Sequence, residues 1–188
     1  MLDFLIGTPW LLALLWAGLY VFDYASTVWL ARVYPAILSK YVVFERGVEL
    51  NPNFERDIAA PRGISLKFII LLSLVVVIIL LSPLIGYAFV EFLAGALLLT
   101  WSFVNSRHLR NFLYVWLVRR KPDALGGQQV QSYWFMQRAL AGEAFVWGLV
   151  YLGLFILLLR VFFLAGTLAC WTVTLRAWLL ANRKFKKA

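Results

Sequence analysis

Apolar runs of about twenty residues recur along this chain, and they constrain its fold more than any other feature. A helix needs about 20 consecutive apolar residues to cross the hydrocarbon core of a bilayer. Of the 188 residues, 63% are hydrophobic and only 14% are charged, whereas about 25% of residues are charged in soluble domains. The runs also lack the alternation of a membrane β-barrel. The sequence therefore predicts an all-α, polytopic membrane helix bundle.

The apolar runs predict a single integral membrane domain over residues 1–188 with five transmembrane helices. The polar connections and the proline positions give the approximate boundaries. The expected spans cover residues 9–31, 65–81, 83–104, 141–159 and 163–181, and the longer loops cover residues 32–63 and 105–140.

Two of these boundaries divide runs that are too long for one crossing of a bilayer. We interpret Ser82-Pro83 as a tight hairpin between the second and third spans, and we place the last turn at Arg160 and Gly166. After Asn105 the helical pattern is compatible with a continuation to Arg120.

Basic residues indicate the orientation. Both long loops and the C-terminal tail are rich in lysine and arginine, whereas the opposite side holds Asp3, the hairpin and Arg160. The positive-inside rule then predicts a cell (inner) membrane protein with its N-terminus outside and its C-terminus in the cytoplasm. The net charge of +9 lies beside apolar runs, so we expect anionic lipid headgroups, and not nucleic acid, as partners.

Composition excludes several kinds of site. The single cysteine, Cys170, cannot form an intrachain disulfide, and the single histidine, His108, cannot form a multi-histidine metal site. Neither the G-x-x-x-x-G-K-[ST] nor the G-x-G-x-x-G pattern of nucleotide-binding loops occurs. We therefore expect no cofactor and no bound metal ion.

Asp23 is the most informative polar residue inside a predicted span. A carboxylate at this depth costs about 2.5–3.5 kcal/mol on insertion scales, so it needs a partner or a proton. Ser26 and Thr27 follow on the same helix face. Two interpretations stay open, a polar cluster that packs helices and a site for a proton or substrate. In both, Asp23 faces the bundle interior and is hydrogen-bonded by Thr27, by another helix, or by both.

Glu91 and Asn105 share one face of the third span, because fourteen residues make about four helical turns. Gly95 and Ser102 lie between them, so this face is small and polar and is expected to contact other helices. Glu91 and Asp23 together suggest two buried acids that form steps of a relay.

His108 and Arg110 belong to a polar run just beyond the third span. A lone histidine among arginines most often contacts headgroups, whereas in a chemical role it could use a carboxylate from the first loop. Arg176, about two turns inside the basic tail, is a candidate ion-pair partner for Asp23 or Glu143.

Glu49 and Asn51 form the most distinctive part of the first loop. Asn51 precedes Pro52 and is suited to cap the next helix, while the role of Glu49 stays open. Because the second and third spans form a hairpin, we predict that Glu49 lies within salt-bridge distance of His108 or Arg110. Such a contact is either a charged clamp or part of a joint site.

Two motifs, D-Y-x-x-T from Asp23 and F-E-x-x-x-E-L-N-P from Phe44, resemble those of a family of small, uncharacterised bacterial multi-pass integral membrane proteins. The resemblance continues through Glu91 and residues 107–111, so it covers most of the chain. It implies a membrane fold but no particular reaction. It also implies joint action of four residues, namely Asp23, Glu49, Asn51 and His108.

Three classes of function are compatible with these features. The first is a non-enzymatic protein that binds or conducts a small ion, a proton or a lipid through polar residues in the bundle, and conduction through a central pore would require a homo-oligomer. The second is an intramembrane enzyme that modifies lipid at the cytoplasmic leaflet. The sequence shows no nucleophile–base arrangement, so we favour the first class over the second. The third is a scaffold subunit with an aromatic-rich docking surface.

Overall fold

A computed structural model describes residues 2–45, 64–122 and 127–182 of the chain. It confirms the predicted all-α class, since five helices within these ranges are long and apolar enough to cross a membrane. The chain is therefore a multi-pass membrane protein by the length and composition of its helices. The helices are α1 (Leu2–Ile6), α2 (Pro9–Val33), the π-helical η1 (Tyr34–Leu38), α4 (Leu66–Leu81), the 3₁₀ turn η2 (Ser82–Leu84), α5 (Tyr87–Arg120), α6 (Tyr133–Leu158) and α7 (Val161–Asn182).

The predicted hairpin at Ser82-Pro83 is confirmed. Helix α4 ends at Leu81, η2 makes the turn, and α5 begins directly after Gly86. Gly86 has φ of 135°, a backbone conformation that side chains with a Cβ rarely adopt. A glycine is therefore required where the chain reverses into α5.

The last turn differs in part from the sequence-based expectation. It lies at Leu159 and Arg160, where Leu159 takes the left-handed conformation with φ of 50°. Gly166 was predicted to mark this turn, but it lies inside α7 and is buried. A Cβ at this position would lie 2.3 Å from Cδ1 of Leu99, so the glycine serves the close approach of α7 to α5.

Helix α5 is longer than the third predicted span. It continues without interruption to Arg120, so residues 105–120 extend the helix and do not form a loop. Helix α6 likewise starts at Tyr133, before the predicted start of the fourth span at residue 141.

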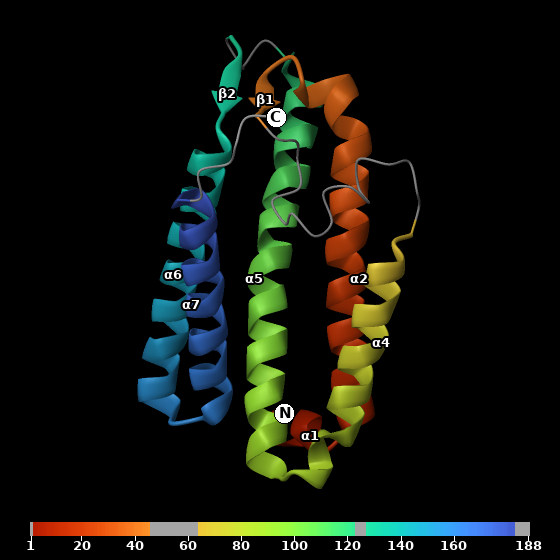
Figure 1. Ribbon diagram of the computed structural model, residues 1–188, viewed down its shortest axis with the longest axis vertical. Helices are drawn as coiled ribbons and strands as arrows, with labels where there is room; N and C mark the ends of the chain where they lie inside the picture. Colours follow the sequence, from red (N-terminus) through yellow and green to blue (C-terminus); the bar gives the residue numbers. More distant parts are fainter. Residues whose placement is uncertain (1, 46–63, 123–126, 183–188) are drawn as a thin grey trace.

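The five long helices stand side by side in one row, in the order α6, α7, α5, α2 and α4 (Figure 1). We expected the hairpin to make the cytoplasmic ends of the second and third spans neighbours, and this is wrong, because α4 packs against α2 and α2 packs against α5. The reason is aromatic contact: Phe68 of α4 stacks on Tyr20 and Tyr24 of α2, with ring centroids 4.9 and 4.2 Å apart.

An aromatic cluster also joins α2 to α5. Trp16 and Tyr20 stack on one another at 5.1 Å, and the Trp101 ring meets both of them edge-on at 5.7 Å. Trp16 is 1% exposed, so this cluster forms the buried centre of the α2–α4–α5 side of the row.

A close backbone crossing joins α5 to α7. A Cβ on Gly95 of α5 would lie only 1.9 Å from the carbonyl oxygen of Phe162, the second residue of α7. Small residues at helix crossings allow this approach, and packing of this kind drives helix association in lipid.

Two short strands join the connections at one end of the row, which we call the strand end. Strands β1 (Val42–Phe44) and β2 (Gln129–Gln131) pair in parallel, with Val43 opposite Val130 (Figure 1). The Tyr34 hydroxyl supports β1 by donating to the carbonyl oxygen of Val42 at 2.8 Å.

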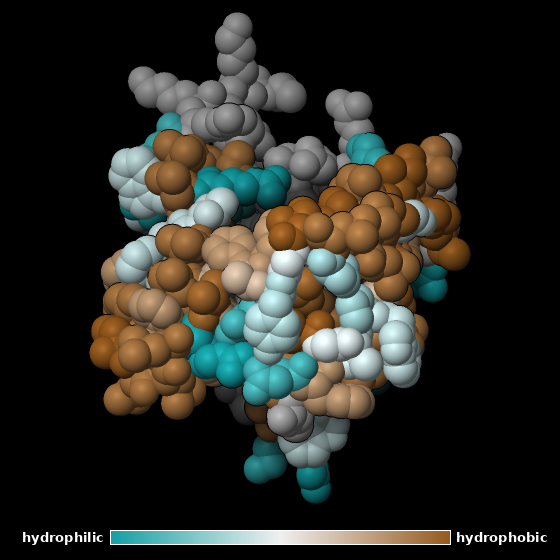
Figure 2. Space-filling model, turned by 90° about the horizontal axis from the view of Figure 1, so that it is seen from below, coloured by the Kyte–Doolittle hydropathy of each residue, from teal (hydrophilic) through white to brown (hydrophobic). Residues whose placement is uncertain are grey.

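The opposite end of the row contains η2 and the α6–α7 turn, and we call it the turn end. From that side, hydrophobic side chains surround a small hydrophilic patch (Figure 2).

Glu45, the residue after β1, binds the start of α6. Its Oε2 atom accepts a hydrogen bond from the backbone N–H of Tyr133 at 3.0 Å, while Ser132 caps the same helix by accepting from Phe135. A carboxylate at a helix N-terminus satisfies free N–H groups and interacts favourably with the helix dipole.

Replacing Glu45 by alanine is therefore expected to lower the free energy of unfolding by about 0.5–1 kcal/mol. The Glu45→Gln variant keeps a hydrogen-bond acceptor but removes the charge, so it should lose only part of this stability. Thermal unfolding in a mild detergent measures both variants. A Glu45→Ala protein as stable as the wild type would show that the Tyr133 contact contributes nothing.

Candidate functional site

Asp23 and His108 form the central polar pair of the row. Asp23 projects from α2 and His108 from α5, and Oδ1 of the carboxylate lies 2.7 Å from Nε2 of the imidazole. Their side chains are 25% and 13% exposed, so both are largely removed from the surface. The expectation that Asp23 is hydrogen-bonded by another helix is thus confirmed. Thr27 lies half-buried one turn further along, and among the described residues it makes no hydrogen bond to Asp23.

Asn105 lies one turn before His108 and also faces α2. Its Nδ2 atom donates to the carbonyl oxygen of Leu19 at 3.0 Å, and the residue is 6% exposed. This supports the prediction that the small polar face of the third span contacts other helices. Among the described residues, none donates a hydrogen bond to the buried Oδ1 atom of Asn105.

Glu143 forms a second charged group with two arginines of α5. Its Oε1 atom lies 2.6 Å from Nη1 of Arg110, and its Oε2 atom lies 2.9 Å from Nε of Arg107. Arg110 therefore bridges α5 to α6, a contact that was not predicted from the sequence.

Arg176, a predicted ion-pair partner, is exposed on α7. The predicted contacts of Glu49, and the capping role of Asn51, lie outside the described residues.

These side chains form one polar layer across the row. Glu143 lies about 23 Å along α6 from Leu158 at the turn end, at 1.5 Å per residue. The hydrocarbon core of a bilayer is about 30 Å thick. The layer of Asp23, His108, Arg107, Arg110 and Glu143 therefore lies at a distance from the turn end that is smaller than the thickness of the hydrocarbon core.

Glu91 belongs to a different cluster at the turn end. Its Oε1 atom accepts from Nε of Arg160 at 2.7 Å, and Nη2 of Arg160 also lies 2.7 Å from Oδ1 of Asp3. The Tyr87 hydroxyl donates to the same Asp3 oxygen at 2.7 Å. The hydrogen bonds from Arg160 and Tyr87 lower the pKa of Asp3 to about 2. Arg160 thus ties α1 and α5 to the start of α7.

The structure does not bring Glu91 and Asp23 together. Glu91 and His108 are about 26 Å apart along the axis of α5. Each acid has its own cationic or imidazole partner, and the space between the two levels along α2 and α5 is largely apolar. A relay from one acid to the other therefore gains no support from their positions.

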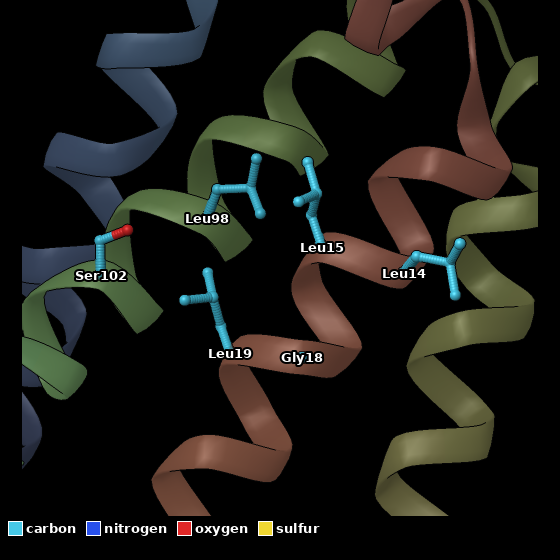
Figure 3. Close-up of a pocket in the computed structure, with 6 residues that line it drawn as sticks. All are labelled: Leu14, Leu15, Gly18, Leu19, Leu98 and Ser102. Atoms are coloured by element: carbon cyan, nitrogen blue, oxygen red, sulfur yellow. The ribbon is translucent and has the colours of Figure 1, made fainter.

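A groove lies between α2 and α5, directly below the polar layer. Its volume is about 410 Å³, and it is lined by five apolar residues and one serine (Figure 3): Leu14, Leu15, Gly18, Leu19, Leu98 and Ser102. Leu14 and Leu15 are 62% and 47% exposed, so the groove opens sideways toward the surroundings of the bundle. Leu19 lies one turn from Asp23, which places the polar pair at one end of the groove.

Sequence reasoning missed this groove and the role of Glu143. Gly18 is the one available signal for the groove, because a residue without a side chain leaves space on a helix face. Nothing in the sequence shows which helix that face meets.

The described residues contain no group of three or more His, Cys, Asp or Glu side chains that could hold a metal ion. Comparisons with protein-family models, curated proteins and solved structures find no match to this chain.

Proposed function

We propose that this protein binds a membrane lipid non-enzymatically, with an acyl chain in the α2–α5 groove and the headgroup toward the Asp23–His108 pair. The groove carries the proposal. Its lining is apolar, its volume of about 410 Å³ falls within the range of about 300–1,000 Å³ typical of small-molecule sites, and its open side faces lipid.

The polar layer supports the same assignment. An acyl chain in the groove would reach Asp23, His108 and Asn105 at the level where glycerol and headgroup oxygens begin. These side chains offer hydrogen-bond donors and acceptors beside an apolar slot, which is the combination that small-molecule sites use to orient a ligand. Ion conduction fits the geometry less well, because one copy of the chain is a row of helices and the groove lining is apolar.

We infer an orientation with the strand end in the cytoplasm, the N-terminus outside, and the protein in the inner membrane. The described basic residues near the strand end include Arg32, Lys40, Arg119, Arg120 and Lys121. Arg160 at the turn end is neutralised by two carboxylates. The positive-inside rule favours this placement, and it puts the polar layer in the leaflet that carries anionic lipids.

Filling the groove is the direct test. The Cβ of a side chain at Gly18 would meet no atom within 4 Å, so the Gly18→Leu variant should fold and occupy the slot. Wild-type protein purified in detergent is expected to retain lipid that native mass spectrometry detects, and Gly18→Leu should retain fewer lipid molecules per chain.

The matched control is Gly153→Leu on α6, where a Cβ also meets no atom within 4 Å. This variant should retain lipid like the wild type. Retention of lipid by Gly18→Leu at the wild-type level would refute the groove as the binding site. Conversion of the retained lipid during incubation of the pure protein would refute a non-enzymatic role and favour the enzyme class.

A further inference from the structure

Arg138 lies between two indole rings near the strand end of the α6–α7 pair. Its guanidinium carbon is 5.5 Å from the ring centroid of Trp134, one turn earlier on α6, and 5.0 Å from that of Trp178 on α7. Both distances fall within the roughly 6 Å range of cation–π contact. The two rings hold the guanidinium plane in one place.

Asn182 fixes the same guanidinium from a third side. Its Oδ1 atom accepts a hydrogen bond from Nη2 of Arg138 at 2.9 Å. The arrangement joins the start of α6 to the end of α7. An arginine held in this way loses little further freedom when it binds a ligand.

The charge of Arg138 is not neutralised within the described part of the chain. Arg107 and Arg110 share Glu143, and Arg160 is bonded to Asp3 and Glu91, but no described carboxylate pairs with Arg138. Its Nη1 group donates to none of the described residues. An ordered cation with free donors is thus left at this point of the surface.

The height of Arg138 places it at a membrane boundary. It lies about 30 Å along α6 from Leu158 at the turn end, which is about the thickness of the hydrocarbon core. Trp134 and Trp178 are 53% and 45% exposed, and tryptophan is enriched at the level of lipid headgroups. Lipid phosphates lie at the same level.

We propose that Arg138, Trp134 and Trp178 form a binding site for the phosphate of an anionic phospholipid. The Nη1 hydrogens donate to the phosphate oxygens in charge-assisted hydrogen bonds, while the two indoles contact the glycerol and upper acyl region. The site lies on α6 and α7 and is separate from the α2–α5 groove. It rests on the membrane placement of the chain, not on binding of lipid in that groove.

The test compares lipid binding by the full chain in detergent, titrated with phosphatidylglycerol or with phosphatidylcholine of identical acyl chains. Native mass spectrometry measures the ratio of the two affinities. Loss of a charge-assisted hydrogen bond to the phosphate is expected to lower the affinity of Arg138→Gln for phosphatidylglycerol at least tenfold. The affinity for phosphatidylcholine should fall less, because its choline cation already offsets the phosphate charge, so the preference for phosphatidylglycerol falls as well. Arg138→Lys keeps the charge but loses the planar fork and should show an intermediate loss, which also serves if Arg138→Gln fails to fold.

Two controls separate this site from diffuse charge and from the groove. Arg119→Gln removes an exposed arginine at the same end of the bundle and should leave the preference unchanged, as should Gly18→Leu. An equal loss in Arg119→Gln, or an unchanged preference in Arg138→Gln, would overturn the proposal.

Millimolar inorganic phosphate should compete only weakly with the lipid for this site. Full displacement of the lipid by inorganic phosphate would identify a free-anion site and overturn the lipid assignment.

Discussion

Replacing Gly95 by alanine is expected to destabilise the bundle by about 3 kcal/mol or more, at or above the upper end of the range for overpacked cores. The added Cβ would lie 1.9 Å from the carbonyl oxygen of Phe162 and 2.6 Å from its carbonyl carbon. Because both atoms belong to the backbone of α7, no side-chain rotation relieves the overlap. Helix α7 must move away from α5, and reversible unfolding in mixed micelles measures the cost.

Gly153→Ala provides the matched control, since both glycines are helical and a Cβ at Gly153 meets no atom within 4 Å. Alanine in a helix interior is favoured over glycine by about 0.5–1 kcal/mol, so the control should be slightly more stable than the wild type. Equal stabilities of the two variants would contradict the close crossing of α5 and α7 at Gly95.

Replacing Arg160 by glutamine is expected to lower the free energy of unfolding, because it leaves the buried carboxylate of Glu91 without its cation. The loss falls on Glu91, whose side chain is only 9% exposed. Without the guanidinium, this carboxylate keeps, among the described residues, only a long contact of 3.4 Å with the backbone N–H of Phe162. Equilibrium unfolding by a chemical denaturant in micelles measures the difference.

Asp3→Asn separates the two partners of Arg160. The Asp3 side chain is 68% exposed, and exposed ion pairs contribute little to stability because solvent screens them. The Asp3→Asn variant should therefore lose much less stability than Arg160→Gln. If both variants lost the same amount, the buried Glu91 could not be the source of the effect.

The spans were predictable because crossing a membrane requires long apolar runs, and proline and polar residues interrupt them. The order of the helices in the row could not be predicted from the sequence. In lipid, the face of a helix that contacts lipid and the face that contacts protein are both apolar, so periodicity does not reveal which face packs. The positions of α4 beside α2 and of α7 beside α5 depend on particular contacts, such as Phe68 on Tyr20 and Gly95 on Phe162.

The candidate site was predictable only in part. The cost of a carboxylate in the membrane made a partner for Asp23 necessary, and the structure supplies His108 from another helix. The identity of that partner depends on the tilt and rotation of α5, which composition does not encode. The pairing of Arg110 with Glu143 could not be predicted for the same reason. The β1–β2 pair was missed because three-residue strands leave no recognisable period in the sequence.

The strand pair has a mechanical consequence for the slot between α2 and α5. Strand β1 follows α2 and its η1 extension, and β2 lies in the connection that leaves α5, so their pairing fastens these two helices at one end. At the other end, Asp3 of α1, just before α2, accepts a hydrogen bond from Tyr87 in the first turn of α5. Because the slot is fastened at both ends, the distance between α2 and α5 is fixed. In the lipid-binding function that we propose, an acyl chain would enter this slot sideways from the bilayer, and its thickness, more than its length, would decide whether it fits.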